Sequence, residues 1–433
     1  MTSPVATARL KDMLRDARTR TLELVVDLDP EQLLGPQIDI VNPLLWEIGH
    51  LAWFHEFFAL RRLEGRNPLL PNADALYNSA LVAHDDRWSL PLPSLDGTLA
   101  YMRSVHEALL ARLDGDVATE EESFLYQLVA FHEDMHGEAF IYTRQTLGYP
   151  APKFAPVETD ATAQAGPWPG DVAIPGGKFL LGADGSAPFV FDNEKWAHPV
   201  SVRPFRIARA PVTNAQFAEF VDAGGYSMRQ LWDDEGWHWR QGAQAEHPVY
   251  WKRDGRGWKV REFDRWKPLP PHQPVIHVNW HEANAWCRWA GRRLPSEAEW
   301  EIAAAAEPTP EGTPGDRKRS YPWGESPPGK KEANLDCAAL GCVDVAAHSA
   351  GDSAWGCRHM IGNVWEWTAS DFAPYPGFAP DIYEEYSAPW FGSRKVLRGG
   401  AWATRGRMIN NTYRNFFPPD RRDIFAGFRT VAL

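Results

Sequence analysis

The sequence predicts an α+β protein in which a helical bundle is followed by a second domain of short strands and helices. Apolar residues at helical spacing run through the first 150 of the 433 residues, where a capping box also marks a helix start. After about residue 170, short β-like runs, frequent turns and many of the 21 tryptophans replace that pattern. A chain of this length is too long for one compact core, so two or three domains are expected.

Four helices are predicted before residue 150. The first runs from about Ala6 to Leu28 and the second from about Asn42 to Arg62, each with apolar residues near helical spacing. A Pro-rich connection leads to a third helix that begins near residues 94–96. The fourth begins at a capping box, Thr119 to Glu122, and ends at Gly148-Tyr149-Pro150. Four such helices fit an up-and-down bundle whose core can hold a metal.

Two histidines in the fourth predicted helix stand four residues apart, at His132 and His136. Such positions share one helix face, so both imidazoles can reach one metal ion. A third, His50, lies in the apolar second helix. Three neutral nitrogen ligands leave coordination positions open, as a catalytic metal site requires. For an isolated pair of this spacing, surface or core histidines are the simpler interpretation, and other features of the chain have to decide.

The segment between the two domains has its own composition. Residues 151–170 are rich in alanine, proline, glycine and threonine and lack periodicity, which is typical of a linker. The predicted organisation is therefore a helical bundle over residues 1–150, a linker over 151–170 and a second domain over 171–433.

Charge and composition exclude several classes of protein. The formal net charge of −12 argues against a nucleic-acid partner. The first residues lack the basic and apolar regions of a signal peptide, and no apolar run is long enough to span a bilayer, so no membrane partner is expected. Four cysteines without a CxxC pair fit neither a disulfide scaffold nor a thiolate zinc site. We expect a soluble cytoplasmic protein.

A series of short motifs runs through the second domain. In chain order they include Ile174-Pro175-Gly176-Gly177, Asp192-Asn193-Glu194, Pro211-Val212-Thr213-Asn214, Val278-Asn279-Trp280, Arg293-Leu294-Pro295-Ser296-Glu297, Tyr321-Pro322-Trp323-Gly324, Gly362-Asn363-Val364-Trp365-Glu366-Trp367 and Leu397-Arg398-Gly399-Gly400. With these motifs the domain resembles the formylglycine-generating, sulfatase-modifying family, which implies a C-type-lectin-like α+β fold. Formylglycine-generating enzymes use a cysteine pair near the C-terminus. This chain has no cysteine after Cys357, so that activity is disfavoured.

The bundle with its three histidines resembles a DinB-type metal-binding bundle. Its fusion to the second domain resembles the sulfoxide synthases of the ergothioneine pathway, the hercynine oxygenases, over essentially the whole chain. Those enzymes use non-haem iron(II) and O2 to join a donor sulfur to imidazole C2 of hercynine, the trimethylammonium betaine of histidine. The resemblance implies an Fe(II) cofactor held by His50, His132 and His136.

The same resemblance implies roles for residues near the C-terminus. Tyr383 matches the active-site tyrosine that supplies a proton during oxidation, and Tyr386 and Asn415 match residues that hold hercynine. A trimethylammonium group accepts no hydrogen bond, so an aromatic face such as that of Phe416 is its best host, contributing about 0.5–2 kcal/mol.

Departures from the family pattern bear on the second substrate. Family members that use γ-glutamylcysteine clamp it with arginines and an aspartate. The first arginine pair matches His84 and Arg87, and the aspartate position holds Phe417, while Arg421 remains. Met135 stands where the family often has a glutamine that touches the imidazole substrate. A pocket directed wholly at a charged γ-glutamyl donor is therefore not expected.

One branch that this pattern resembles is selenoneine synthase, which couples a selenosugar to hercynine. A neutral sugar needs fewer charged clamps, so the sequence favours carbon–selenium bond formation with a selenosugar donor. The first alternative is carbon–sulfur bond formation with cysteine or γ-glutamylcysteine. Two other classes stay open: a lectin-like binding module without catalysis, and a zinc-dependent thiol transferase of the DinB type.

Other polar residues near the three histidines are expected to be structural or exposed. His55 is five residues beyond His50 and should point away from it, as a structural or exposed side chain. Glu133 and Asp134 flank the histidine pair, where they either orient an imidazole or lie on a solvated helix face.

Overall fold

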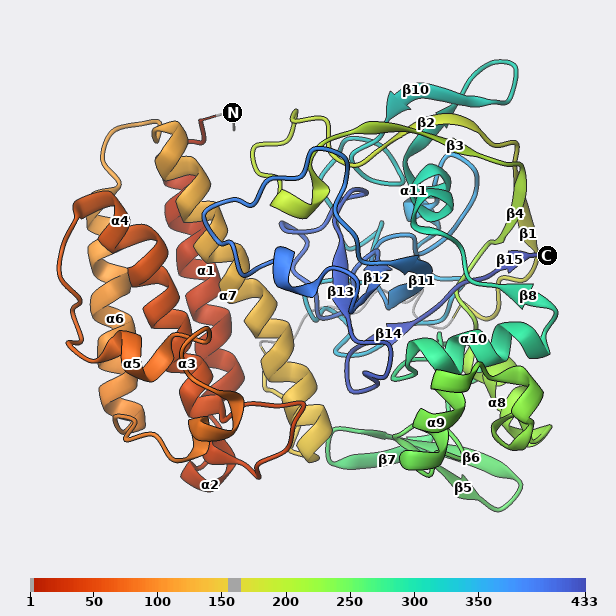
Figure 1. The fold of residues 1–433 in the computed structure, drawn as a ribbon, viewed down its shortest axis with the longest axis horizontal. Coiled ribbons are helices and arrows are strands. Elements are labelled where there is room, and N and C mark those ends of the chain that lie inside the picture. Colours follow the sequence, from red (N-terminus) through yellow and green to blue (C-terminus); the bar gives the residue numbers. More distant parts are fainter. Residues whose placement is uncertain (1–3, 155–164) are drawn as a thin grey trace. The chain divides into compact units, whose positions relative to one another are not determined.

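The computed structural model describes residues 4–154 and 165–433, which divide into two compact units. The bundle unit contains the residues up to 154 together with Asp184–Val190 and Pro380–Tyr386, and the second unit contains the other described residues (Figure 1). The predicted linker falls largely on residues 155–164, which lie outside the described part. Within the described part, no helix is both long and apolar enough to cross a bilayer.

Helices form the bundle unit, as predicted. They are α1 (Thr7–Val25), α2 (Pro30–Leu34), α3 (Leu44–His55), the π-helical turn η1 (Glu56–Leu60), α4 (Arg61–Glu64), α5 (Ala73–Tyr77), the 3-10 turn η2 (His84–Trp88), α6 (Leu95–Arg112) and α7 (Glu120–Leu147). Within the unit, α1 packs on α7 and α3 packs on α6.

The helix ends follow the sequence signals. Thr119 caps α7 through a reciprocal capping box with Glu122, and Gly148 ends the helix in the left-handed conformation. Ser94 caps α6 by accepting a hydrogen bond from the Gly97 amide. These boundaries of the third and fourth predicted helices are confirmed.

The second predicted helix differs from expectation because it contains a π-helical turn. After α3 the helix widens at η1, where the Glu56 side chain is fully buried. Its carboxylate accepts hydrogen bonds from the Leu69 amide and, at 2.5 Å, from the Tyr101 hydroxyl. Such turns are rare and carry no reliable sequence signal, which is why the prediction gave one regular helix.

Two of the flanking residues are more buried than the sequence suggested. Glu133 and His55 are almost completely buried, which rules out a solvated helix face for Glu133 and leaves the structural alternative for His55. Glu133 accepts hydrogen bonds from Arg18 Nε at 2.9 Å and Thr21 Oγ1 at 2.7 Å, and His55 Nε2 lies 3.1 Å from its other oxygen. Burial by itself would raise the pKa of Glu133, but Arg18 and His55 hold it well below its usual range. The cluster joins α1, α3 and α7.

Breaking this buried cluster is expected to destabilise the fold. Arg18→Met leaves the buried Glu133 carboxylate without its guanidinium, which should lower the free energy of unfolding by about 3 kcal/mol. Urea denaturation of the metal-free protein measures this loss. Arg15→Met is the matched control on the same helix, because its ion pair with Asp12 is exposed and should contribute less than about 1 kcal/mol. Equal midpoints for the two variants would contradict the structural role of Arg18.

The second unit mixes short strands and helices, which confirms the predicted change of texture. Its strands are β1 (Asp171–Ile174), β2 (Gly177–Leu181), β3 (His198–Val202), β4 (Phe205–Ala208), β5 (Trp251–Asp254), β6 (Gly257–Glu262), β7 (Arg265–Pro268), β8 (Arg292–Arg293), β9 (Ala306–Pro308), β10 (Pro314–Lys318), β11 (Trp365–Asp371), β12 (Lys395–Arg398), β13 (Asn415–Phe417), β14 (Ala426–Gly427) and β15 (Val431–Ala432). Its α-helices are α8 (Asn214–Asp222), α9 (Asp234–Gly242), α10 (Trp280–Trp289) and α11 (Glu297–Ala305).

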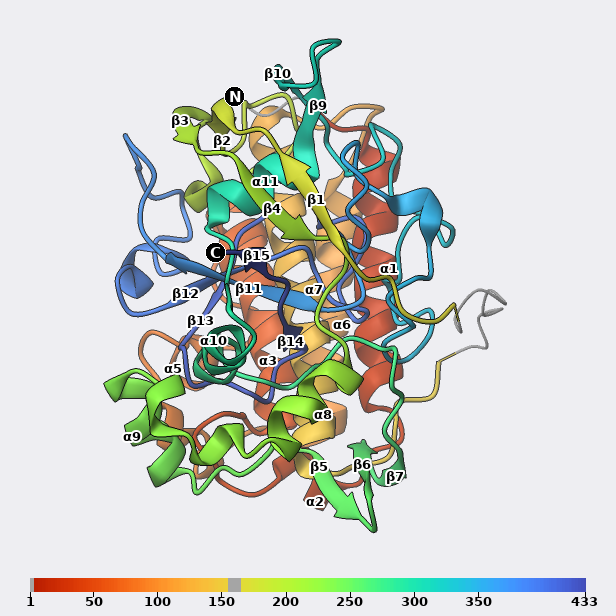
Figure 2. The ribbon, with the colours of Figure 1, turned by 90° about the vertical axis from the view of Figure 1, so that its right-hand side faces the viewer.

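Two four-stranded sheets organise this unit (Figure 2). One has the order β1-β4-β15-β8 and the other β13-β12-β11-β14. Buried ion pairs tie elements of the unit together: Arg398 of β12 pairs with Glu297 and Glu301 of α11, and Arg429 pairs with Glu366 of β11. The strands are short, and charged residues occupy buried positions. The periodicity of apolar residues therefore revealed little of the strand order in this unit.

Candidate metal centre and its surroundings

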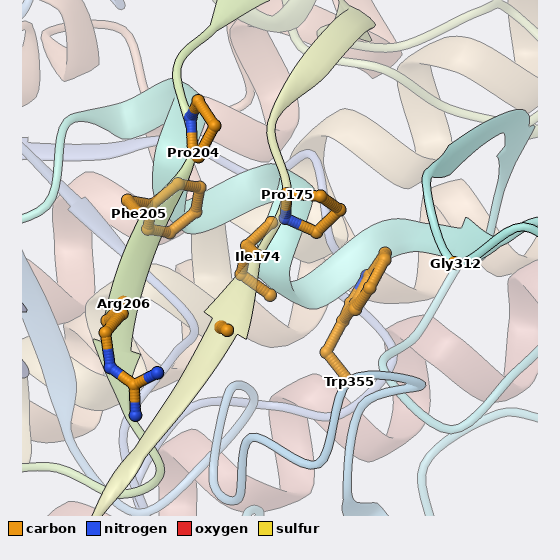
Figure 3. A pocket seen from close by; sticks show the side chains of 8 residues that line it. Ile174, Pro175, Pro204, Phe205, Arg206, Gly312 and Trp355 are labelled. Carbon is orange, nitrogen blue, oxygen red and sulfur yellow. The ribbon is translucent and has the colours of Figure 1, made fainter.

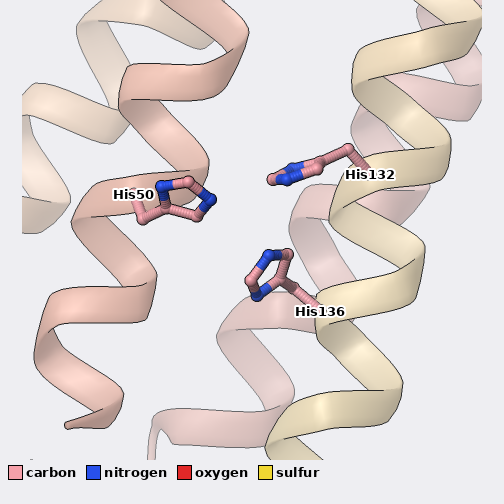
Figure 4. A group of neighbouring side chains, drawn as sticks. All are labelled: His50, His132 and His136. Carbon is pink, nitrogen blue, oxygen red and sulfur yellow. The ribbon is translucent and has the colours of Figure 1, made fainter. Parts of the chain in front are cut away.

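Three histidines of the bundle unit meet in one cluster (Figure 4). His50 comes from α3, and His132 and His136 come from successive turns of α7. Each offers one ring nitrogen, and these atoms lie within 4.8 Å of one another. Burial lowers the pKa of both His50 and His132 well below the usual range, so these rings are neutral at neutral pH, as metal ligands must be. The chemistry of this donor set fits a transition metal.

The orientation of His50 is fixed by a hydrogen bond to the backbone. Nδ1 of His50 lies 2.8 Å from the Tyr77 carbonyl oxygen. A carbonyl only accepts, so Nδ1 carries the proton and Nε2 keeps its lone pair for a metal. The Trp46 ring stacks on the His50 ring at a centroid separation of 4.9 Å and restricts its rotation.

Gly49 makes this arrangement possible. A Cβ at position 49 would lie 2.1 Å from a carbon of the Tyr77 ring, a separation that real structures do not contain. The missing side chain therefore lets Tyr77 approach α3 closely enough for its carbonyl oxygen to meet His50.

Gly49→Ala is expected to damage both the fold and the site. Tyr77 must move to admit the methyl group, which should cost about 2 kcal/mol of unfolding free energy and displace the hydrogen-bond acceptor of His50. Urea denaturation and metal titration measure the two effects. Gly137→Ala is the matched control, since this helical glycine follows His136 and its Cβ would meet only Leu24 at 3.8 Å. Similar losses in both variants would contradict the explanation.

The other two histidines have different surroundings. His132 stacks face to face on Phe54, with centroids 3.4 Å apart, and its buried Nδ1 has no hydrogen-bond partner among the described residues. Nδ1 of His136 lies 3.6 Å from the carboxylate of Glu47, which is buried on α3. The three rings therefore differ in what stands behind them: a backbone carbonyl, an aromatic face and a carboxylate.

Two predicted site tyrosines lie beside this cluster in the bundle unit. Tyr383 packs edge-on against His132 and Phe54, with centroid separations of 5.9 Å and 5.0 Å. Tyr386 stacks on Tyr383, and its hydroxyl donates to the Met135 sulfur at 3.7 Å. Burial raises the pKa of Tyr383 above its usual range, so its phenol stays protonated at neutral pH.

His84 and Arg87 lie on η2, and both make contacts within the bundle unit. One ring nitrogen of His84 lies 2.8 Å from the Val41 carbonyl oxygen and the other 3.1 Å from Asp85. Arg87 donates to Asn42 Oδ1 at 2.6 Å, and its guanidinium lies 4.1 Å from the centre of the Trp46 ring.

The remaining predicted site residues belong to the second unit. Asn415, Phe416 and Phe417 form β13, where Phe416 stacks on Phe372 at 3.9 Å. Arg421 donates two hydrogen bonds of 2.6 Å to the carboxylate of Asp423 and lies over the Phe417 ring. The charge of Arg421 is thus neutralised inside the unit.

A surface pocket of about 440 Å³ opens elsewhere in the second unit (Figure 3). Its walls are mostly apolar and come from β1, β4 and neighbouring loops: Ala173, Ile174, Pro175, Pro204, Phe205, Arg206, Gly312 and Trp355. None of the predicted site residues lines it.

Sequence reasoning missed several residues that contact the histidines. Glu47 and Trp46 sit in an apolar helical run, and Tyr77 acts through its backbone. A helical glutamate is usually solvated, so its type and position gave no signal. For Tyr77 the sequence offered one signal: Gly49, directly before the predicted ligand His50, leaves room for a closely packed neighbour.

Comparison with known proteins supports the predicted architecture. Residues 13–139 match the DinB superfamily, and residues 157–432 match the sulfatase-modifying factor enzyme 1-like domain, which confirms the predicted fold class. The chain is 39% identical to a hercynine oxygenase of Mycolicibacterium thermoresistibile over 98% of this chain and 94% of that protein. It is 38% identical to one of Mycobacterium tuberculosis over 99% of both. A formylglycine-generating enzyme of Streptomyces coelicolor is 32% identical over 60% of this chain and 88% of its own.

Proposed function

The chain belongs to the hercynine oxygenase family and is an oxidoreductase, and we propose that it forms a carbon–chalcogen bond at imidazole C2 of hercynine with iron(II) and O2. The observation that carries the proposal is the cluster of His50, His132 and His136 in a chain that aligns with hercynine oxygenases over almost its whole length. This full-length similarity argues against a lectin-like module without catalysis.

We assign the metal to this cluster because its donor set suits iron(II). Three neutral imidazoles would hold the ion and leave positions free for substrates. When bound, iron(II) would supply the redox chemistry that O2 requires and bring the reactants together. The hydrogen bond of His50 Nδ1 to the Tyr77 carbonyl fits a ring whose other nitrogen faces a ligand.

The protein's own groups would then bind and protonate. Tyr383 is protonated and adjacent to His132, so we assign it the proton donation during oxidation. Tyr386 and Met135 would bound the imidazole of hercynine, and Asn415 would donate or accept a hydrogen bond to the same substrate. Phe416 would offer an aromatic face to the trimethylammonium group.

We propose that the donor is neutral, with a selenosugar favoured over a thiol. Arg421, which matches a donor-clamping arginine, already has a bidentate partner in Asp423. Phe417 brings no charge, and both nitrogens of His84 are engaged. A donor with two carboxylates and an ammonium would have to compete with these contacts, whereas a sugar hydroxyl would not. Cysteine and γ-glutamylcysteine, giving a carbon–sulfur bond, are the alternative donors.

A donor competition tests the proposal. Iron(II)-loaded protein receives hercynine and O2 with cysteine, γ-glutamylcysteine or 1-seleno-N-acetylglucosamine, separately and together, and products are read by mass spectrometry. A dominant hercynine–selenium adduct is expected. A dominant sulfur adduct would assign the chain to ergothioneine synthesis. No adduct with O2 unconsumed would overturn the hercynine oxygenase activity itself.

We propose a metal-binding bundle over residues 1–150 and a sulfatase-modifying-type domain over 171–433, joined by 151–170. We also propose a cytoplasmic location, supported by the free thiols of all four cysteines: Cys287, Cys337, Cys342 and Cys357.

A further inference from the structure

A buried carboxylate, that of Glu47, lies beside the three histidines. The residue is 2% exposed, and no lysine or arginine nitrogen of the described residues lies within ion-pair distance of its carboxylate. One oxygen lies 3.6 Å from His136 Nδ1 and accepts a hydrogen bond from Asn42 Nδ2 at 2.9 Å. The other oxygen is buried without a hydrogen-bond partner among the described residues. A buried carboxylate this poorly paired destabilises a fold, so it needs a compensating role.

We propose that Glu47 is a positioning residue that orients His136 and strengthens its binding of a metal ion; this rests on the metal role proposed above for His136. The carboxylate faces Nδ1, so it selects the tautomer whose Nε2 lone pair is free. Carboxylates behind a ligating histidine strengthen metal binding in this way. At 3.6 Å the contact is electrostatic, and it is longer than a hydrogen bond by about half an ångström.

Glu47 makes His136 different from its two neighbours. His50 has a neutral carbonyl behind Nδ1, and His132 has an aromatic ring against its face. Among the ion pairs of the described residues, the contact with Glu47 is the one that brings a negative charge to one of the three rings. That charge would offset the positive charge of a divalent ion. Disturbing the orientation of His136 should therefore weaken metal binding more than disturbing that of either other histidine.

The same carboxylate links the metal cluster to a proposed donor-binding residue. Asn42 donates to Glu47 and accepts from Arg87 Nη1 at 2.6 Å, so Arg87 reaches His136 through two side chains. Arg87 also lies on the Trp46 ring, and Trp46 stacks on His50. Arg87 is therefore connected to two of the three histidines, and removing its side chain should change metal affinity without touching a ligand.

Metal titration tests this inference without turnover. Cobalt(II) is titrated into metal-free protein against a competing chelator, without hercynine or O2, for Glu47→Gln, Glu47→Asp and Asn42→Ala. Glu107→Gln is the control, because Glu107 is exposed on α6. Glu47→Gln should weaken affinity about 10–100-fold. Glu47→Asp should retain part of the affinity, and Asn42→Ala should show a smaller loss.

The melting temperature of the metal-free protein separates positioning from folding. Glu47→Gln removes a buried charge, so that temperature should stay constant or rise. Unchanged cobalt affinity would overturn the proposal, and so would weaker affinity accompanied by a less stable metal-free protein. Failure of the hercynine reaction is a separate result, since wild-type protein that forms no adduct can still bind cobalt in a Glu47-dependent way.

Discussion

Replacing His132 with alanine is expected to abolish metal binding and turnover together. The variant removes one of three nitrogens and leaves the other two, His50 and His136, on different helices. Two ligands would hold the ion weakly, and the hercynine reaction should fall at least about a thousandfold, or about 4 kcal/mol in activation free energy. Elemental analysis of purified protein and O2 consumption with hercynine measure the two losses.

His238→Ala is the matched control, because this histidine lies exposed on α9. It should keep both metal and activity. The metal-free His132 variant should also remain folded, with near wild-type circular dichroism, since the Phe54 ring that stacked on the imidazole keeps its other neighbours. Full metal content with full turnover in His132→Ala would remove this residue from the ligand set.

Tyr383→Phe is expected to slow the oxidation while leaving substrate binding intact. The change removes one hydroxyl, and the ring can still pack against Phe54, Phe58 and His132. Loss of a general acid typically costs about 10²–10⁴-fold in rate, so kcat should fall in that range with KM for hercynine nearly constant. Product analysis should also show a larger share of simple donor oxidation.

Tyr149→Phe provides the comparison, because Tyr149 lies just beyond the end of α7 and outside the cluster. Its rate and products should match those of the wild-type protein. If Tyr383→Phe also keeps the wild-type rate and product, the proton comes from another group.

Sequence signals predicted those parts of the bundle that depend on local rules. Thr119 and Glu122 marked the start of α7 because a capping box is a contact within four residues, and the i,i+4 spacing of His132 and His136 fixed their common face. The π-helical turn at Glu56 was not predictable, since its carboxylate is satisfied by Leu69 and Tyr101 from other segments. Local periodicity contains no information on such partners.

The burial of Glu133 has a related cause. The sequence left open whether Glu133 orients an imidazole or lies on a solvated helix face, because helical spacing does not show which neighbouring helix covers a face. In the structure α1 covers that face through Arg18 and Thr21. Whether a helix is buried on two faces depends on which other helices pack against it. The partners of Glu47 and Arg421 escaped prediction because spacing alone does not distinguish a paired charge from a solvated one.

Residues 380–386 belong to the bundle unit, although the rest of that unit comes from the described residues up to 154 and from Asp184–Val190. This has a consequence for synthesis on the ribosome. A nascent chain that has completed α7 already contains His50, His132 and His136, but the codons for Tyr383 and Tyr386 are still untranslated. The proposed metal ligands are therefore synthesised before the proposed proton donor. If both roles hold, the oxidation can be completed only after nearly the entire polypeptide has been made, and truncated translation products would bind metal without completing the reaction.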